Sequence, residues 1–468
     1  MNIYGIWIPN NGITCPPEIR SFGGQNEENA GFTNNLHWKG VIKMNKEQCG
    51  KFFSDELLKE LREQIECVDH DPAGKRIYFE NAGGALTLKS CCEIAATANK
   101  IPDFPNRPTP GAKPLQEMLD KGLQDAKLTF GAKSGAILAD LTVSKAIGTM
   151  TGVIMKSVPG TNVVTTELEH PATYDSCMLY GELFDKEVRV AKIDLKTGAV
   201  DIEDLLSKID RNTILLSLIH ASNITGILNE IETIVTEARK INPELHILLD
   251  STQHVPHGII DVESLKIDAA GYAPYKILGK RGLGIGWISD RVARLPHPRF
   301  LEGSETEWDL GGYEPAGMAG LTLVTDYVCR IGKKFSDKTD RRELFIAGMN
   351  AIELQERAIM YRMLHGSGEV AGVNDIGGVT IHFVDDLTRR DCILPMTFDN
   401  IEPVDAVRKF IENGIYVYHR SRSNKMSRRV LDGVGIPSLV RVAPMHYNTK
   451  EEVDAFLRVT AKIARNEI

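Results

Sequence analysis

The central part of the chain alternates short apolar runs with longer stretches of helical period. Several of these runs between residues 76 and 330 are nearly all apolar, which is typical of strands buried on both faces of a parallel sheet. The predicted strands are RIYFE, NVVTTE, VRVAKI, TILLSLIH, HILLD, AAGYA and IGWIS. This alternation predicts a large α/β domain over residues 76–330.

The pattern changes on both sides of this domain. Residues 1–75 form a polar leader, in which the one strong helix prediction covers residues 54–68 with Ser54 as its N-cap. From residue 331 a long helical stretch leads into the strand GGVTIHFV and then into a second strand and helix set, which ends in TKEEVDAFLRVTAKIARNEI. This order predicts a smaller C-terminal α+β domain over residues 331–468.

Composition narrows the class of protein. The 468 residues are 42% hydrophobic and 25% charged, which is usual for a globular enzyme, and the formal net charge is −8. An acidic chain is a poor partner for nucleic acid or for an anionic membrane surface. No apolar run is long enough to predict a membrane span, and no basic segment precedes an apolar run as in a signal peptide. The eight cysteines are scattered without metal-binding spacing, so we expect no metal site, reduced thiols and a cytoplasmic location.

One acid and one lysine indicate the chemistry. The strand HILLD ends in Asp250, and Lys276 follows the next predicted strand just before a glycine-rich stretch. Such a pair suits pyridoxal phosphate, because a lysine forms a Schiff base with the cofactor aldehyde and an acid keeps the pyridine nitrogen protonated. The protonated ring then draws in the electrons of a bond at the substrate α-carbon.

Other polar residues follow neighbouring strands. An imidazole at His170 can stack on a flat ring, and the amide of Asn223 can bond a phenolic oxygen. The segment GAILADLTVSKAIG reads as a strand, a polar turn with Thr142 and Ser144, and a helix start, which is a layout for binding phosphate. Each residue alone is more often a cap or turn residue. Together they lie at carboxyl ends of strands, where open parallel sheets bind ligands.

The order EHPAT, HASNITG, DSTQ and YKILGKRGLGIGW resembles the class V aminotransferase family of fold-type I pyridoxal phosphate enzymes, and cysteine desulfurases and selenocysteine lyases in particular. YFENAGGA, WDLGGYEPAGMAGL and VRVAPMHYNTKEEVDAFL resemble further family segments, so that the resemblance covers about residues 76–465. It implies a large domain with a mostly parallel seven-stranded sheet, a smaller C-terminal α+β domain, pyridoxal 5'-phosphate as cofactor, an amino-acid substrate and a homodimer.

The resemblance also implies roles around the cofactor ring. Lys276 would carry the Schiff base and move protons at the α-carbon, and Asp250 would pair with the pyridine nitrogen. Gln253 and Asn223 would bond the phenolic oxygen. His170 would stack on the ring and take part in proton transfer.

For the phosphate, the resemblance implies Ser144 together with backbone groups around Thr142 and Val143. Arg441 would hold the substrate carboxylate through a two-pronged hydrogen bond, which a guanidinium makes better than an ammonium group.

The sequence departs from the family pattern near the phosphate. The usual Ser-Gly-His triplet before the lysine is replaced by residues 273–275, Ala-Pro-Tyr. One phosphate ligand is therefore missing, and Tyr272 or Tyr275 is a candidate replacement. The family threonine that reaches a phosphate across the dimer interface is replaced by Gly312, whose backbone N–H alone remains available.

A second departure concerns sulfur transfer. The segment 414–435, where related desulfurases carry their persulfide-forming cysteine, contains no cysteine, and the nearest one upstream is Cys392. The segment carries His419, Arg420 and Arg422 instead, and these residues are candidates for binding a second acidic group of a substrate. A desulfurase needs a thiolate to accept sulfur.

Three interpretations follow from this departure. The preferred one is a desulfurase-like C–S lyase that lacks the persulfide cysteine. An aminotransferase or epimerase on the same scaffold is the alternative. A non-enzymatic paralogue is disfavoured, because Lys276, Asp250, His170, Asn223 and Gln253 are retained together.

Overall fold

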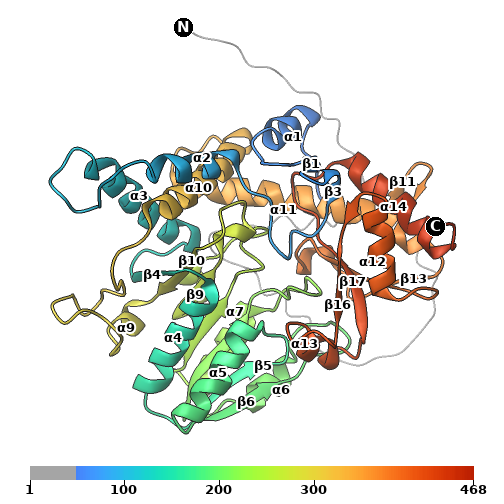
Figure 1. Ribbon diagram of the computed structural model, residues 1–468. Coiled ribbons are helices and arrows are strands. Elements are labelled where there is room, and N and C mark those ends of the chain that lie inside the picture. Colours follow the sequence, from blue (N-terminus) through green and yellow to red (C-terminus); the bar gives the residue numbers. More distant parts are fainter. Residues whose placement is uncertain (1–48) are drawn as a thin grey trace.

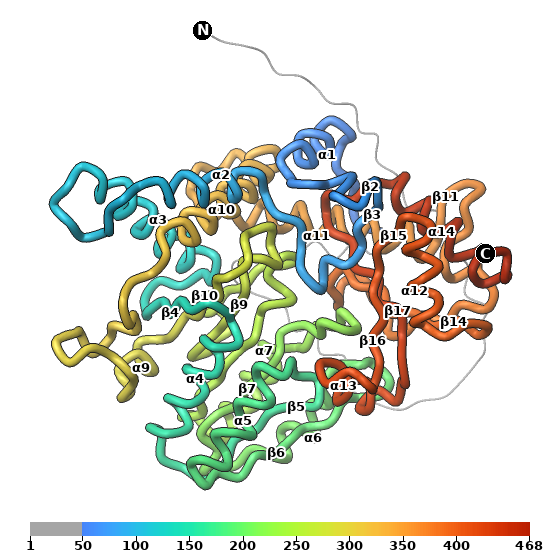
Figure 2. Tube along the Cα trace, viewed as in Figure 1, coloured from blue at the N-terminus to red at the C-terminus, as the bar shows by residue number. Residues whose placement is uncertain are grey.

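The computed structural model describes residues 49–468, and its central feature is a seven-stranded sheet (Figures 1 and 2). The strand order is β4-β10-β9-β8-β7-β5-β6. Strand β10 runs antiparallel to both of its neighbours, and the other pairs are parallel. The predicted mostly parallel sheet of seven strands is confirmed. Its strands are β4 (Ala136–Asp140), β5 (Asn162–Thr166), β6 (Glu187–Ala191), β7 (Thr213–Ile219), β8 (His246–Asp250), β9 (Ala269–Tyr272) and β10 (Gly284–Ile288).

Helices cover this sheet on both faces, which explains why its central strands are buried throughout. Every residue of β5, β7, β8, β9 and β10 is buried. Helices α4 and α5 pack side by side on the sheet, and α3 and α10 pack together nearby. The helices are α2 (Lys89–Ala98), α3 (Ala112–Phe130), α4 (Val143–Ser157), α5 (Pro171–Leu183), α6 (Ile202–Ser207), α7 (Ile231–Ile241), α8 (Val262–Leu265), η1 (Pro274–Lys276), α9 (Asp290–Ala293) and α10 (Pro315–Phe335).

The C-terminal part has a core of its own, built on an antiparallel sheet of order β13-β14-β17-β16. Helices α12 and α14 contact each other, and α11 packs along α10 and α14. The elements are α11 (Arg341–His365), β11 (Gly366–Ser367), β12 (Val370–Ala371), η2 (Val373–Asp375), β13 (Val379–Ile381), η3 (Leu387–Arg389), β14 (Leu394–Phe398), α12 (Pro403–Glu412), β15 (Ile415–Tyr416), β16 (Tyr418–Ser421), α13 (Arg428–Gly433), β17 (Ser438–Val442) and α14 (Lys450–Ala464).

The start of the described chain lies against this C-terminal part. Three short strands occur there: β1 (His70–Asp71), β2 (Gly74–Lys75) and β3 (Ile77–Tyr78). Strand β3 pairs in parallel with β15. The domain boundaries at 75/76 and 330/331 stay predictions, and α10 runs continuously through the second of them.

Two local expectations need correction. Helix α1 (Asp55–Arg62) is capped by the Ser54 hydroxyl as predicted, but it ends well before residue 68. It ends there because Ile65 forms a β-bridge with Leu88, so tertiary pairing outweighs helical propensity. In addition, Cys49 is disulfide-bonded, so the expectation that all cysteines are reduced is wrong for this residue. Sequence spacing says nothing of the distance between two thiols.

Between residues 49 and 468, no helix is both long enough and apolar enough to cross a bilayer.

Candidate active site

The predicted acid lies at the carboxyl edge of the large sheet. Asp250 ends β8 and is buried, with the ends of β7 and β9 in register beside it. One carboxylate oxygen accepts the N–H of Thr252 at 3.0 Å, and the other lies 3.4 Å from the hydroxyl of Thr173. These bonds hold the carboxylate in a fixed orientation at the strand end.

Lys276 follows the neighbouring strand β9 on the short helix η1. Its side chain is only 7% exposed, and its amine donates to the carbonyl of Ala82. The pKa of Lys276 is lowered to about 7, mainly by burial and next by the positive charge of Arg441, while the negative charge of Glu80 opposes this shift. Much of the amine is therefore neutral near pH 7, which is the form that attacks an aldehyde.

His170 is close enough to Asp250 and Lys276 for both charges to affect its pKa. It is the N-cap of α5, where its Nδ1 accepts the N–H of Ala172 at 3.1 Å. Burial lowers the pKa of His170, while Asp250 raises this pKa and Lys276 lowers it. The ring is therefore neutral, with its proton on Nε2. Such a ring can stack on a cofactor and exchange a proton.

The predicted phosphate turn is a helix start. Helix α4 begins at Val143, and the hydroxyl of Thr142 caps it by accepting the N–H of Lys145 at 3.2 Å. A Cβ on Gly284 would lie 1.9 Å from the backbone nitrogen of Val143, so this position of β10 must be glycine. The glycine-rich stretch after Lys276 therefore lets β10 approach the turn. Ser144 lies exposed on the first turn of the helix, beside the N–H groups of an anion-binding end.

The two tyrosines proposed as phosphate ligands differ in position. Tyr272 is fully buried against Phe130, with ring centroids 5.0 Å apart, so it belongs to the core. Tyr275 is half-buried, and its ring centroid lies 5.5 Å from the amine of Lys276 and 4.6 Å from the guanidinium carbon of Arg281. Only Tyr275 therefore lies beside the candidate site.

Gly312 lies in the exposed loop before α10. Its φ of +94° favours glycine, and its N–H donates to the Asp309 carboxylate at 2.7 Å. Within one chain this N–H already has an acceptor. Its predicted contact with a phosphate across a dimer interface stays a prediction.

Gln253 and Asn223 contribute to the site in different ways. Gln253 is buried, with its amide nitrogen 3.3 Å from Nε2 of His257, and its Oε1 has no protein partner. Asn223 is half-buried, and its backbone carbonyl accepts a hydrogen bond from Arg441 at 2.6 Å. The loop after β7 therefore positions Arg441.

Arg441 comes from the C-terminal sheet. It lies on β17 with 0% side-chain exposure and forms an ion pair with Glu80. The sequence predictions missed Glu80, although it precedes the asparagine of the YFENAGGA motif. Arg420 lies on the adjacent strand β16, where burial lowers its pKa to about 10 and Arg441 adds to this shift. Arg422 is partly exposed and pairs with Asp432 at 2.9 Å, so it points to a different partner.

A second carboxyl group was also missed. Glu169 is fully buried beside His170, and burial raises the pKa of Glu169 to about 8. The guanidinium of Arg429 donates to the Glu169 carbonyl at 2.6 Å and lies 3.6 Å from the ring centroid of Tyr174. The EHPAT segment contains Glu169, but only the fold shows that it is buried.

The residues present fit pyridoxal phosphate. Several buried polar atoms of this region have no protein partner, among them Gln253 Oε1, Glu80 Oε2, Arg420 Nε and Arg441 Nε. Buried polar atoms are rarely left unpaired, so such a set indicates a polar ligand. The acid, the largely neutral amine and the helix start match the three functional parts of the cofactor: its pyridine nitrogen, its aldehyde and its phosphate.

Comparison with known proteins agrees with this chemistry. The profile of the class-V aminotransferases matches residues 144–456. Cysteine desulfurases from Pectobacterium carotovorum and Yersinia pseudotuberculosis are each 24% identical over 66% of this chain and 72% of their own lengths. The protein therefore belongs to the class-V aminotransferase family, and it is a pyridoxal phosphate-dependent enzyme.

Solved structures support the fold. A cysteine desulfurase from Thermococcus onnurineus NA1 matches with a TM-score of 0.73 and 18% identity, over 87% of this chain and 98% of its own. One from Escherichia coli matches with a TM-score of 0.71 and 18% identity, over 88% and 99%. The predicted fold-type I class is confirmed.

Proposed function

We propose that this enzyme is a lyase that cleaves the Cβ–S bond of a cysteine-type amino acid and releases the sulfur as free sulfide or thiol. The observation that carries the proposal is the absence of cysteine from segment 414–435, while the lysine, acid and imidazole of the site are all present. Relatives named cysteine desulfurases favour a sulfur-bearing substrate. The missing acceptor thiol favours release of the sulfur over its transfer to the protein.

Cys392, the nearest upstream cysteine, is a poor substitute acceptor. It is buried, and its Sγ lies 3.6 Å from the carbonyl of Glu356. Burial raises the pKa of Cys392 well above its usual range, so the thiol stays protonated. Because the thiolate is the form that accepts sulfur, this residue does not supply the missing function.

Each side chain of the site has a separate role in this reaction. The bound cofactor supplies the electron sink for the α-carbon. Lys276 removes the α-proton, and Asp250 keeps the pyridine nitrogen protonated. Arg441 binds the carboxylate, and the Nε2–H of His170 donates a hydrogen bond to the sulfur as it departs. Overall, cysteine and water give pyruvate, ammonia and hydrogen sulfide, so that atoms balance without an oxidant.

A substrate screen tests the reaction class. We expect cysteine and β-substituted cysteines to give pyruvate and ammonia with no added keto acid. Turnover that requires a keto acid, with a pyridoxamine form of the cofactor, would show an aminotransferase instead. Inversion at the α-carbon without loss of sulfur would show an epimerase.

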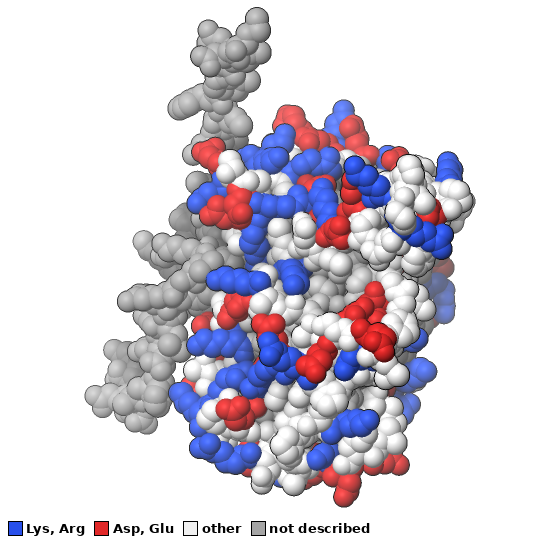
Figure 3. Space-filling view, turned by 90° about the vertical axis from the view of Figure 1, so that its left-hand side faces the viewer, with Lys and Arg blue, Asp and Glu red and all other residues white. Residues whose placement is uncertain are grey.

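We also propose a homodimer with the active site near its interface. Exposed apolar side chains gather on the loop before α10 and on the loop between α2 and α3, including Leu301, which is 95% exposed, with Phe300, Leu310 and Phe104. Both loops project from the same side of the molecule, and Figure 3 looks onto that side. Exposed apolar clusters mark interaction surfaces, and a two-fold dimer is the commonest assembly. Sedimentation should give twice the chain mass; a fully active monomer would contradict this.

A cytoplasmic location is also proposed. Six of the described cysteines are free thiols, which are typical of a reducing compartment.

A further inference from the structure

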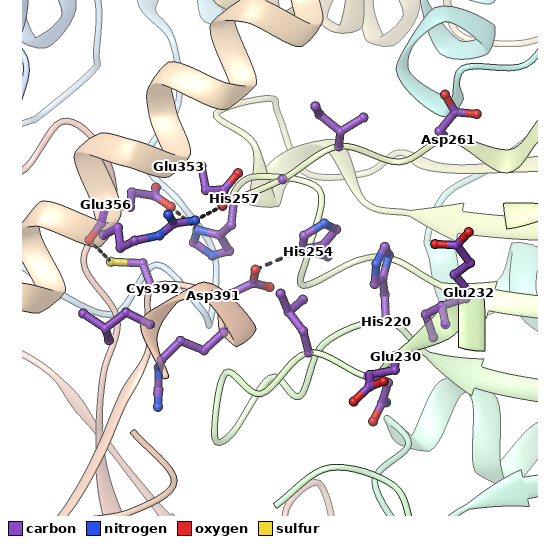
Figure 4. Close-up of a pocket in the computed structure, with 18 of the residues that line it drawn as sticks. His220, Glu230, Glu232, His254, His257, Asp261, Glu353, Glu356, Asp391 and Cys392 are labelled. Carbon is purple, nitrogen blue, oxygen red and sulfur yellow. Dashed lines mark hydrogen bonds and ion pairs between the residues drawn. The ribbon is translucent and has the colours of Figure 1, made fainter. Parts of the chain in front are cut away.

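A cavity of about 260 Å³ lies where the large domain meets helix α11 (Figure 4). Its walls come from the start of α7, the loop after β8, helix α11 and the segment 387–392. Lys276 and Asp250 are not among the residues that line it. The cavity is therefore distinct from the candidate active site, and a ligand in it would contact both parts of the chain.

Asp391 offers a buried carboxylate oxygen to this cavity. Its side chain is only 2% exposed, and its Oδ1 atom lies 2.9 Å from Nδ1 of His254. The other oxygen, Oδ2, is buried without a hydrogen-bond partner among the described residues. Figure 4 shows the carboxylate pointing towards His254, between the residues of α11 and those of the large domain. Since buried polar atoms are rarely left unpaired, Oδ2 indicates a ligand that donates a hydrogen bond.

Much of the remaining wall is apolar. Leu228 and Ile231 contribute to it near the start of α7, and Met360 contributes from α11. An ordered water needs two to four polar partners, whereas an apolar group gains by removing such a wall from water. Drug-sized ligands occupy pockets of about 300–1,000 Å³, so this cavity suits a smaller molecule that has an apolar body.

The charges of the wall favour a cation over an anion. Four of its carboxylates already have partners: Glu230 with Arg389, Asp261 with Arg342, Glu353 with Arg357, and Glu356 with His257. Glu232, in the first turn of α7, has no ion-pair partner among the described residues. Arg390 also lines the cavity, but its guanidinium donates to main-chain carbonyls, and only its buried Nε lacks a partner in the described chain. An anion would therefore gain one N–H group and face the carboxylates of Asp391 and Glu232.

We propose that this cavity binds a small organic cation, with its charged group bonded to Oδ2 of Asp391 and its apolar body packed against Leu228, Ile231 and Met360. Glu230 and Glu232 line the cavity and are exposed, so its entrance is acidic and attracts a cation. The bound cation connects α11 with the large domain. This binding does not depend on the reaction catalysed at Lys276.

The test is titration calorimetry of the holoenzyme with n-butylguanidinium. A guanidinium keeps its charge at every accessible pH, and a protonated guanidinium does not form a Schiff base with the cofactor as an amine would. n-Butylurea has the same shape without the charge. We expect one n-butylguanidinium per chain, and at least about tenfold weaker binding of n-butylurea, because hydrogen bonds between charged groups are stronger than those of a neutral donor.

Variants locate the bound cation. Asp391→Asn should weaken n-butylguanidinium binding roughly tenfold to a hundredfold and leave n-butylurea binding unchanged. If Asp391→Asn fails to fold, Leu228→Trp serves instead, because its larger side chain fills the cavity and should abolish binding of both probes. Glu232→Gln should weaken binding of the cation a few-fold. Its matched control is Glu237→Gln on the same helix, outside the lining and paired with Lys240, which should bind as wild type.

Three results would overturn the inference. One is the absence of saturable n-butylguanidinium binding by the holoenzyme. Another is equal affinity for n-butylguanidinium and n-butylurea, or wild-type affinity for the cation in both Asp391→Asn and Leu228→Trp. The third is a Michaelis constant for the amino-acid substrate that rises in proportion to the concentration of n-butylguanidinium, which would place this probe in the active site.

Discussion

Replacing Lys276 with alanine should remove the covalent attachment of the cofactor and abolish turnover. This amine is buried, largely neutral near pH 7, and lies at the sheet edge that also carries Asp250. Loss of proton transfer alone costs about 10²–10⁴-fold in rate, and loss of the Schiff base adds to it. Absorbance spectra, and peptide mapping after borohydride reduction, measure the attachment.

A nearby lysine serves as the control for this variant. Lys280 is partly exposed and pairs with Glu314 at 2.8 Å. Lys280→Ala should keep the visible band and the wild-type rate. If Lys276→Ala kept the band and full activity while Lys280→Ala lost them, the assignment of Lys276 would be wrong.

Replacing Arg441 with lysine should raise the Michaelis constant for the amino acid while leaving the cofactor band in place. A lysine cannot reproduce the two-pronged bond to a carboxylate, and it would also lose the contacts that Arg441 makes with Glu80 and the Asn223 carbonyl. A charged pair broken in a desolvated site costs about 2–5 kcal/mol. The constant should therefore rise roughly thirty-fold to several-thousand-fold. Steady-state kinetics over a range of substrate concentrations measures it.

Two further arginines provide a control and an alternative for this prediction. Arg422 is partly exposed and bound to Asp432, so Arg422→Lys should behave as wild type. Arg420 is buried beside Arg441 on the adjacent strand. If the Michaelis constant stayed unchanged in Arg441→Lys but rose strongly in Arg420→Lys, Arg420 would be the residue that binds the substrate carboxylate.

The positions of several site residues could be predicted because strand ends are visible in the sequence. Apolar runs mark β5, β7 and β8, and parallel strands bring their carboxyl ends to one edge. His170, Asn223 and Asp250 therefore had to lie near one another. The same reasoning placed Thr142 at the start of α4, since a strand, a polar turn and a helix follow in order.

Pairs that form across the fold could not be predicted in this way. Glu80 meets Arg441 over a separation of 361 residues, and His257 meets Glu356 over 99. Neither pair has a local pattern, because each depends on how the C-terminal sheet and α11 pack against the large domain.

The central claim is that the sulfur leaves the active site as free sulfide or thiol and is not transferred to a cysteine of the protein. Its most direct test is turnover of L-cysteine, with pyruvate, alanine and sulfide quantified and the mass of the intact protein recorded during the reaction. We expect pyruvate and sulfide in equal amounts, with no sulfur added to the protein. Stoichiometric alanine together with a protein heavier by one sulfur atom would contradict the claim, and peptide mapping would then show which cysteine accepted it.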